Sequence, residues 1–271
     1  MAIAPELTAS IHPTAIIDRS AELDAGVEIG PYCIIGPHVF LGAGTVLHAH
    51  VVIQGYTRIG SNCQIHSGAI IGGPPQDTKF KNERSYVSIG DNNILRECVT
   101  IHRATGEGNR TVLRDNIMLM AYAHVAHNCD IGNYVTIASY AGISGHVTVE
   151  DNANIGGIVG VHQFCRIGRL AMVGGMSGVT QDVPPYMLAA GRPAKVYDVN
   201  TRGLRRYGIS QQVRIQLREA YKLLYRSDLN VTQAMEAIGE EIPISQELDH
   251  LLEFIRSIRN GVSGRGNNLM S

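Results

Sequence analysis

The sequence contains no tryptophan and only 4 phenylalanines and 11 tyrosines among its 271 residues. A chain of this length can bury a large core, but small aliphatic side chains must fill most of it. No apolar run approaches the ~20 residues of a membrane-spanning helix, which predicts no membrane insertion. The first ten residues, MAIAPELTAS, have neither the basic nor the apolar segment of a signal peptide. We therefore expect a cytoplasmic protein.

Cysteine and net charge are also sparse. The five cysteines are an odd number and include no CxxC pair, which argues against a disulfide framework and against a thiolate zinc site. The formal net charge is only -1, so there is no overall attraction to nucleic acids or anionic membranes. We expect reduced thiols and no nucleic-acid partner.

What the sequence does contain is an aliphatic residue at every sixth position. Of the 29 positions in this frame from Ile11 to Val179, 26 are Ile, Leu or Val. The three exceptions are Asp77, Glu83 and Glu107. They fall in polar stretches that predict loops leaving and rejoining the repeat near residues 77–88 and 105–112, and such insertions are often functional.

Each frame residue is preceded, two positions earlier, by a small or β-branched residue, and on a strand both side chains point inward. Four of the five cysteines occupy this inward position, among them Cys129. Cys129 is therefore better interpreted as a core thiol than as a nucleophile. Glycine often follows the frame residue, as at Gly30 and Gly132, where we expect a corner that uses the conformational freedom of glycine.

A period of six with frequent turns is the hexapeptide repeat of a parallel β-helix, a class that coils left-handed with three hexads per turn. The period ends after Val179, and the prolines of QDVPPY stop the ladder. Ser210 can cap a helix, and residues 229–238 and 246–258 have the periodicity of further helices. The predicted fold is mainly β, with a left-handed parallel β-helix over residues 1–190 and a C-terminal α-helical domain over residues 191–271.

Residues one turn apart stack at a strand spacing of roughly 4.8 Å, so His127, Gly145 and Gln163 form a column at one corner. His124 and His146 lie on the same edge. A histidine base on one coil and a glycine N–H on the next suit acyl transfer, with the N–H receiving the developing oxyanion.

Three other interpretations remain open. The histidines could be only surface or inter-subunit hydrogen-bonding groups, as other histidines lie on the repeat without such convergence. Some hexapeptide-repeat proteins are zinc carbonic anhydrases, for which three imidazoles and a water suffice. Those enzymes resemble HxxxxH at the ligand strand, whereas His124 and His127 are spaced as HxxH and the sequence contains no HxxxxH. The third interpretation is a non-catalytic repeat protein that shares only the scaffold.

The stretches MAYAHVAHNC, VHQFCRIG and AYKLLYRS resemble the cytoplasmic UDP-N-acetylglucosamine acyltransferases that begin lipid A biosynthesis. The resemblance covers essentially the whole chain. It implies a homotrimer without a cofactor or a metal that transfers an (R)-3-hydroxyacyl group from acyl carrier protein to the 3-hydroxyl of UDP-N-acetylglucosamine.

By the same resemblance, His127 is the general base and the backbone N–H of Gly145 is the oxyanion donor. The substrate contacts that it implies are Asp77, Lys79, His102, His124, His146, Gln163, Asn200 and Arg206. Gly175 matches the position that limits acyl chain length. The family often has an aspartate after the catalytic histidine where this sequence has Asn128, and an amide can orient an imidazole without stabilising its positive charge.

A basic stripe follows the repeat. Arg214, Arg218 and Lys222 are each four residues apart, so they share one helix face. Such a stripe can be only a solvated surface. We expect it to be the docking surface for acyl carrier protein, an acidic partner.

Overall fold

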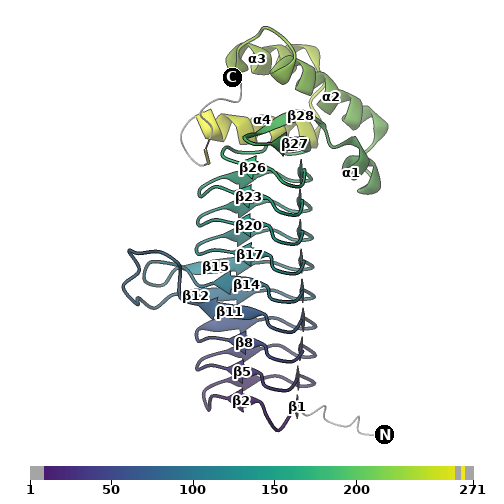
Figure 1. Ribbon diagram of the computed structural model, residues 1–271. Coiled ribbons are helices and arrows are strands. Elements are labelled where there is room, and N and C mark those ends of the chain that lie inside the picture. The colour runs from purple at the N-terminus through teal and green to yellow at the C-terminus, as the bar shows by residue number, and fades with distance from the viewer. Residues whose placement is uncertain (1–8, 260–263, 266–271) are drawn as a thin grey trace, which may run out of the picture.

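The computed structural model describes residues 9–259, 264 and 265. The chain winds into a straight three-sided prism, and the helices lie across its C-terminal end (Figure 1). Three sheets form the sides of the prism.

Sheet A contains β1 (Ser10–Ile11), β4 (Glu28–Ile29), β7 (Val46–Leu47), β10 (Gln64–Ile65), β13 (Ile94–Leu95), β16 (Met118–Leu119), β19 (Thr136–Ile137), β22 (Asn154–Ile155), β25 (Met172–Val173), β27 (Met187–Gly191) and β28 (Ala194–Val199). Sheet B contains β2 (Ile16–Ile17), β5 (Ile34–Ile35), β8 (Val52–Ile53), β11 (Ile70–Gly73), β14 (Thr100–His102), β17 (His124–Val125), β20 (Gly142–Ile143), β23 (Gly160–Val161) and β26 (Gly178–Val179). Sheet C contains β3 (Glu22–Leu23), β6 (Phe40–Leu41), β9 (Thr57–Ile59), β12 (Tyr86–Ile89), β15 (Arg110–Leu113), β18 (Asp130–Ile131), β21 (Thr148–Val149) and β24 (Arg166–Ile167).

The strands pair in parallel with the register that the hexads predict. Val125 of β17 pairs with Ile143 of β20, which in turn pairs with Val161 of β23. The aliphatic frame residues from Ile29 onward are buried, and so are the inward residues two positions before them. The prediction of a left-handed parallel β-helix followed by helices is confirmed, and Cys129 is a buried core thiol as expected.

The prediction about the corner glycines is wrong. Gly30 and Gly132 are not among the residues with positive φ. They are small because the next coil approaches closely: a Cβ atom on Gly30 would lie 2.9 Å from the carbonyl carbon of His48. The left-handed position is the third residue after the frame, and side chains as large as Tyr140 (φ 61°) and His146 (φ 60°) occupy it.

Two insertions project from the corner between sheets B and C (Figure 1). Residues 74–85 join β11 to β12, and residues 103–109 join β14 to β15, close to the loops predicted from the frame. The loops are tied together, since Gly106 N–H donates to Glu83 Oε1 (2.9 Å) and Arg84 N–H donates to Glu107 Oε2 (2.9 Å).

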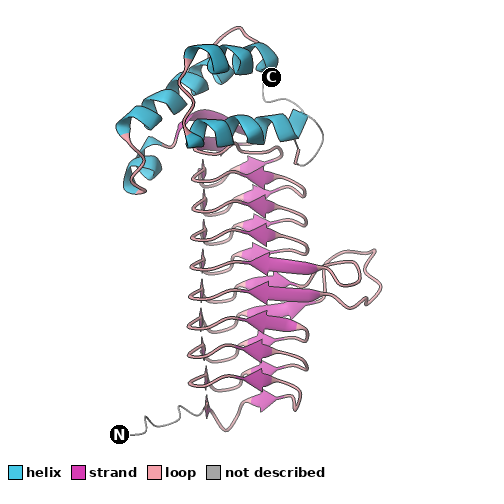
Figure 2. Ribbon diagram, turned by 180° about the vertical axis from the view of Figure 1, so that it is seen from behind, coloured by secondary structure: helices cyan, strands magenta, loops and turns pink. Residues whose placement is uncertain are grey.

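The C-terminal helices are α1 (Thr201–Arg206), α2 (Gln211–Tyr225), α3 (Val231–Glu241) and α4 (Gln246–Arg259), and they cap the prism (Figure 2). Ser210 caps α2 by accepting a hydrogen bond from Val213 N–H, and α3 and α4 lie where helices were predicted. Neither α1 nor the β27–β28 hairpin was predicted, and the expected domain boundary at residue 190 falls inside that hairpin. No helix in the described part of the chain is long and apolar enough to cross a membrane.

Candidate functional site

The corner between sheets B and C, from which the insertions project, also carries His127 and Gly145, and we call it the His127 ridge. His127 and Gly145 each follow a sheet B strand by two residues, and they lie next to one another on successive coils as the register predicts. A Cβ atom built on Gly145 would lie 2.5 Å from Cε1 and 2.6 Å from Nε2 of His127. The imidazole therefore occupies the space in front of Gly145, and only glycine fits there without displacing it.

Asn128 fixes the orientation of His127. Asn128 Oδ1 lies 2.8 Å from His127 Nδ1 and accepts hydrogen bonds from the N–H and the hydroxyl of Thr105, both at 2.9 Å. Asn128 Nδ2 donates to the carbonyl of Thr105 (3.1 Å), so Oδ1 must be the acceptor toward the ring. His127 Nδ1 then carries the proton, which leaves a lone pair on Nε2 for use as a base.

The backbone N–H of Gly145 is available as a donor. The equivalent N–H at the corner after sheet C belongs to Asn133. It donates to Asp151 Oδ1 of the next coil at 2.7 Å. The next coil beyond Gly145 carries Gln163, which is exposed. Within the residues that the structure describes, the buried Gly145 amide has no acceptor. A buried donor without an acceptor favours a ligand oxygen.

His124 and His102 form a neutral pair beside the ridge. Their ring centroids are 5.0 Å apart with the rings edge to face, and His124 Nδ1 lies 2.8 Å from Thr100 Oγ1. Burial lowers the pKa of His124 to about 4 and also lowers the pKa of His102. His102 is buried, and its Nδ1 has no hydrogen-bond partner in the described structure.

His146 and the first insertion approach the ridge from outside. The His146 ring lies 5.2 Å from that of His127 and stacks on Phe164. Burial lowers the pKa of His146, and the Asp77 carboxylate in the first insertion opposes this shift. Asp77 Oδ1 accepts a hydrogen bond from Lys79 N–H (2.9 Å), and the Lys79 side chain is exposed.

Other predicted residues are not brought to the ridge within one chain. Gly175 lies at the corner between sheets A and B, where it is exposed. Asn200 is buried and caps α1: its Oδ1 accepts from Gly203 N–H and its Nδ2 donates to Leu170 O. Arg206 ends α1 and is exposed. Both ribbon views place α1 on the opposite side from the insertions (Figures 1 and 2).

The basic stripe lies on α2. Arg218 donates to Thr201 Oγ1 (3.0 Å) and Arg214 donates to the carbonyl of Ser210 (3.4 Å), while Lys222 is exposed. Because α2 is one of the helices that cap the prism, the basic stripe lies at the C-terminal end of the prism.

Thr100 and Thr105 are site residues that sequence reasoning missed. Thr100 pairs with His124 across 24 residues rather than 18, because the second insertion adds one hexad. The insertion adds one whole hexad, and from this length the pairing of Thr100 with His124 could have been predicted. Thr105 lies inside the insertion, where no repeat fixes its position.

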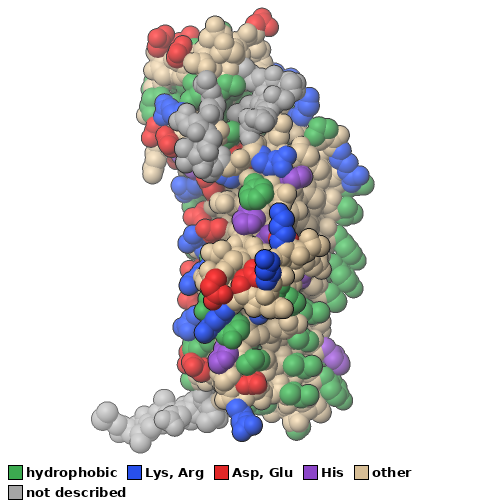
Figure 3. Space-filling model, turned by 90° about the vertical axis from the view of Figure 1, so that its left-hand side faces the viewer, with side chains coloured by type: hydrophobic (Ala, Val, Ile, Leu, Met, Phe, Trp, Pro, Cys, Tyr) green, Lys and Arg blue, Asp and Glu red, His purple; other side chains and the backbone are tan. Residues whose placement is uncertain are grey.

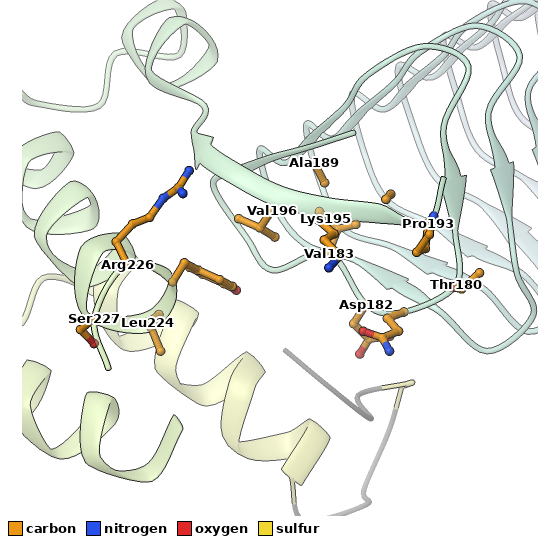
Figure 4. Close-up of a pocket in the computed structure, with 13 residues that line it drawn as sticks. Thr180, Asp182, Val183, Ala189, Pro193, Lys195, Val196, Leu224, Arg226 and Ser227 are labelled. Carbon is orange, nitrogen blue, oxygen red and sulfur yellow. The ribbon is translucent and has the colours of Figure 1, made fainter. Parts of the chain in front are cut away.

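A cavity of about 400 Å³ lies elsewhere, between the β27–β28 hairpin and α2 (Figure 4). Asp182, Lys195 and Arg226 are among the residues that line it, and none of the predicted site residues does. No three His, Cys, Asp or Glu side chains among residues 9–259, 264 and 265 are grouped as a metal site.

A hexapeptide-repeat β-helix with a histidine ring beside an unpaired glycine amide is typical of the class of hexapeptide-repeat acyltransferases. Two protein families match the chain: "Bacterial transferase hexapeptide (six repeats)" at residues 110–145, and "Udp N-acetylglucosamine O-acyltransferase; Domain 2" at residues 182–266. The acyl-(acyl-carrier-protein)–UDP-N-acetylglucosamine O-acyltransferase of Synechocystis sp. is 52% identical over 233 residues, which are 86% of this chain and 84% of that protein. The enzyme of the same name from Syntrophobacter fumaroxidans is 47% identical over 254 residues, or 93% of this chain and 98% of that one.

Solved structures agree. The UDP-N-acetylglucosamine acyltransferase of Bacteroides fragilis superposes with a TM-score of 0.90 at 38% identity, covering 94% of this chain and 98% of that one. LpxA from Acinetobacter baumannii superposes with a TM-score of 0.85 at 44% identity, covering 90% and 96%. The chain belongs to the acyl-(acyl-carrier-protein)–UDP-N-acetylglucosamine O-acyltransferase family.

Proposed function

We propose that this protein transfers an (R)-3-hydroxyacyl group from acyl carrier protein to the 3-hydroxyl of UDP-N-acetylglucosamine, the first step of lipid A biosynthesis. The observation that carries the proposal is the placement of His127 Nε2 beside the unpaired Gly145 N–H. The names of the relatives favour this activity over a carbonic anhydrase or a scaffold without activity.

In the proposed mechanism, His127 Nε2 takes the proton of the sugar hydroxyl as its oxygen attacks the thioester carbonyl carbon. The carbonyl oxygen becomes an oxyanion and accepts the hydrogen bond of Gly145 N–H. When the intermediate collapses, the carbon–sulfur bond breaks, and the carrier thiolate takes the proton from His127. An ester forms without a covalent acyl-enzyme, a metal or another cofactor.

The surrounding side chains have supporting roles in this proposal. Asp77 and Lys79 contact the sugar from the first insertion. His102 and His124 offer neutral imidazole groups to polar substrate atoms, since burial lowers both pKa values. His146 and Gln163 extend the contact surface along the ridge.

The complete site is proposed to need a homotrimer in the cytoplasm. Sheet B exposes an apolar row in its N-terminal half, with Ile16 65% exposed, Ile34 45% and Ile70 40%, and such a patch is typical of an interface. Subunits packed through sheet B would let Gly175, Asn200 and Arg206 of one chain reach the His127 ridge of its neighbour. Asn200 would then contribute through groups other than the side-chain atoms that cap α1.

The experiment that tests this function is transfer of a radiolabelled acyl group from acyl carrier protein to UDP-N-acetylglucosamine, before and after treatment with a chelator. We expect an O-acylated sugar nucleotide at an undiminished rate after chelation. Stoichiometric zinc together with chelator-sensitive activity would favour the zinc-enzyme alternative. Absence of transfer from carriers of every chain length would favour the scaffold alternative.

A further inference from the structure

Three arginines on and beside sheet C lack the carboxylate partners that other arginines of this sheet have. Arg114 pairs with Asp130 at 3.0 Å and Arg166 pairs with Asp182 at 2.8 Å. Arg58, Arg84 and Arg110 are exposed, and among the described residues none has a carboxylate oxygen within 4.0 Å. None of the three therefore forms a direct ion pair, although they lie close together.

Aromatic rings hold these guanidinium groups in place. Arg58 lies 3.7 Å from the ring centroid of Phe40, and Arg84 lies 4.8 Å from that of Tyr56. Arg84 and Arg110 also share Tyr86, at 5.8 and 5.9 Å. A guanidinium attracted to an aromatic ring forms no hydrogen bond in that contact, so its N–H groups can still donate in pairs to phosphate oxygens.

The three arginines line one groove of about 320 Å³, to which His38 also contributes. Figure 3, which looks at the side that carries the insertions, shows basic, histidine and hydrophobic side chains close together on its lower half, with acidic side chains among them. Glu22 is the one carboxylate among the residues that line the groove. Glu83 and Glu107 lie nearby in the insertions, where their carboxylates accept hydrogen bonds from the Gly106 and Arg84 N–H groups. The lining itself therefore carries three arginines against one carboxylate, with aromatic rings in its walls.

We propose that this groove is a second ligand site, separate from the His127 ridge, that binds a diphosphate group carried by a small molecule. Three forked donors can hold the several oxygens of a diphosphate, and the volume lies at the lower end of the range for ligand pockets. Arg84 lies one residue before the end of the first insertion, and Arg110 directly follows the second. A bound diphosphate would therefore bridge the bases of the two loops, of which the second holds Asn128 through Thr105.

The test is calorimetric titration of the full chain with inorganic pyrophosphate. We expect one site per chain whose Kd rises at least tenfold in the Arg58→Gln/Arg110→Gln variant and also rises with salt. The matched control is Arg114→Gln, an arginine of the same sheet that already has Asp130, and it should bind as the wild type does. Arg58→Lys/Arg110→Lys should bind with intermediate affinity, because it keeps the charge and loses the fork.

A further variant separates this site from the proposed sugar-nucleotide site. Arg206→Gln should leave pyrophosphate binding unchanged. If Arg206→Gln abolishes binding and the groove variants do not, or if no pyrophosphate binds at millimolar concentration, the inference is overturned.

Repeating the titration with UDP and ADP identifies the source of the diphosphate. Groove-dependent binding that is tighter than that of pyrophosphate indicates a nucleoside diphosphate, and equal binding indicates the free diphosphate. Neither result depends on acyl transfer.

Discussion

The imidazole of His127 lies directly against the backbone of Gly145, in the space that any side chain at position 145 would need. One residue thus supplies the proposed base and the next coil supplies the proposed oxyanion donor, at a separation set by the pairing of β17 with β20. The rigidity of the stacked coils holds both groups before a substrate arrives, which is what electrostatic stabilisation of a transition state needs.

The Gly145→Ala variant should lose about 10²-fold in kcat, because the added methyl group pushes the imidazole away from the oxyanion donor. The control is Gly239→Ala in α3, outside the repeat, where an added Cβ atom also meets nothing within 4 Å. Steady-state rates and melting temperatures should be measured for both. Equal rates in the two variants would show that the contact with His127 is not used.

Asn128 should act through orientation. Asn128→Ala removes the acceptor for His127 Nδ1 and the contacts to Thr105, so kcat should fall roughly 10- to 100-fold, an expectation scaled down from the cost of losing a base. Asn128→Asp keeps the acceptor and adds a charge that favours the protonated ring. The acid limb of its kcat/KM profile should move to higher pH. An unshifted profile together with full activity in Asn128→Ala would contradict a positioning role.

The folded state should lose stability in mild acid. Burial lowers the pKa of His124 from 6.5 to about 4, so the unfolded chain binds more protons than the folded chain between these values. The free energy of unfolding should therefore decrease as pH falls from about 6.5 toward 4 and should not depend on His124 above that window. His102 contributes in the same direction. Urea unfolding at pH 7 and pH 5, at fixed protein concentration, should give a smaller difference for His124→Gln than for the wild type.

Charge reversal at Arg214 and Arg218 should raise KM for acyl carrier protein and leave KM for UDP-N-acetylglucosamine nearly unchanged. The effect should grow as salt is lowered, because less screening strengthens both the native attraction and the new repulsion. Kinetics at two ionic strengths measure it. Equal effects on both substrates, or none on either, would indicate that the stripe is only a soluble surface.

The repeat could be predicted from sequence because each hexad buries its own aliphatic residue. The six-residue period stays in phase across both insertions because each insertion adds a whole number of hexads. Ile71 therefore pairs with Ile101, and Ile101 pairs with Val125. The antiparallel β27–β28 hairpin follows no such period, so its residues gave no comparable signal. The corner glycines were misinterpreted because close approach of coils and positive φ both select glycine, and only coordinates separate the two causes.

The site was predictable only where it lies on the repeat. His127 and Gly145 follow from the register. The contact between Thr105 and Asn128 depends on how a loop folds back, and no periodicity encodes that. Gly175 lies at another corner of the prism, so its role as a chain-length limit stays a prediction about neighbouring subunits.

The measurement that tests the central claim most directly is the single-turnover rate of acyl transfer in His127→Ala, with the oligomeric state checked by light scattering. General-base catalysis typically contributes 10²–10⁴-fold, and the half-buried corner position of His127 adds little to the core. We predict a folded oligomer that has lost at least about 10²-fold in rate. A variant that keeps a tenth or more of the wild-type rate would contradict His127 as the base.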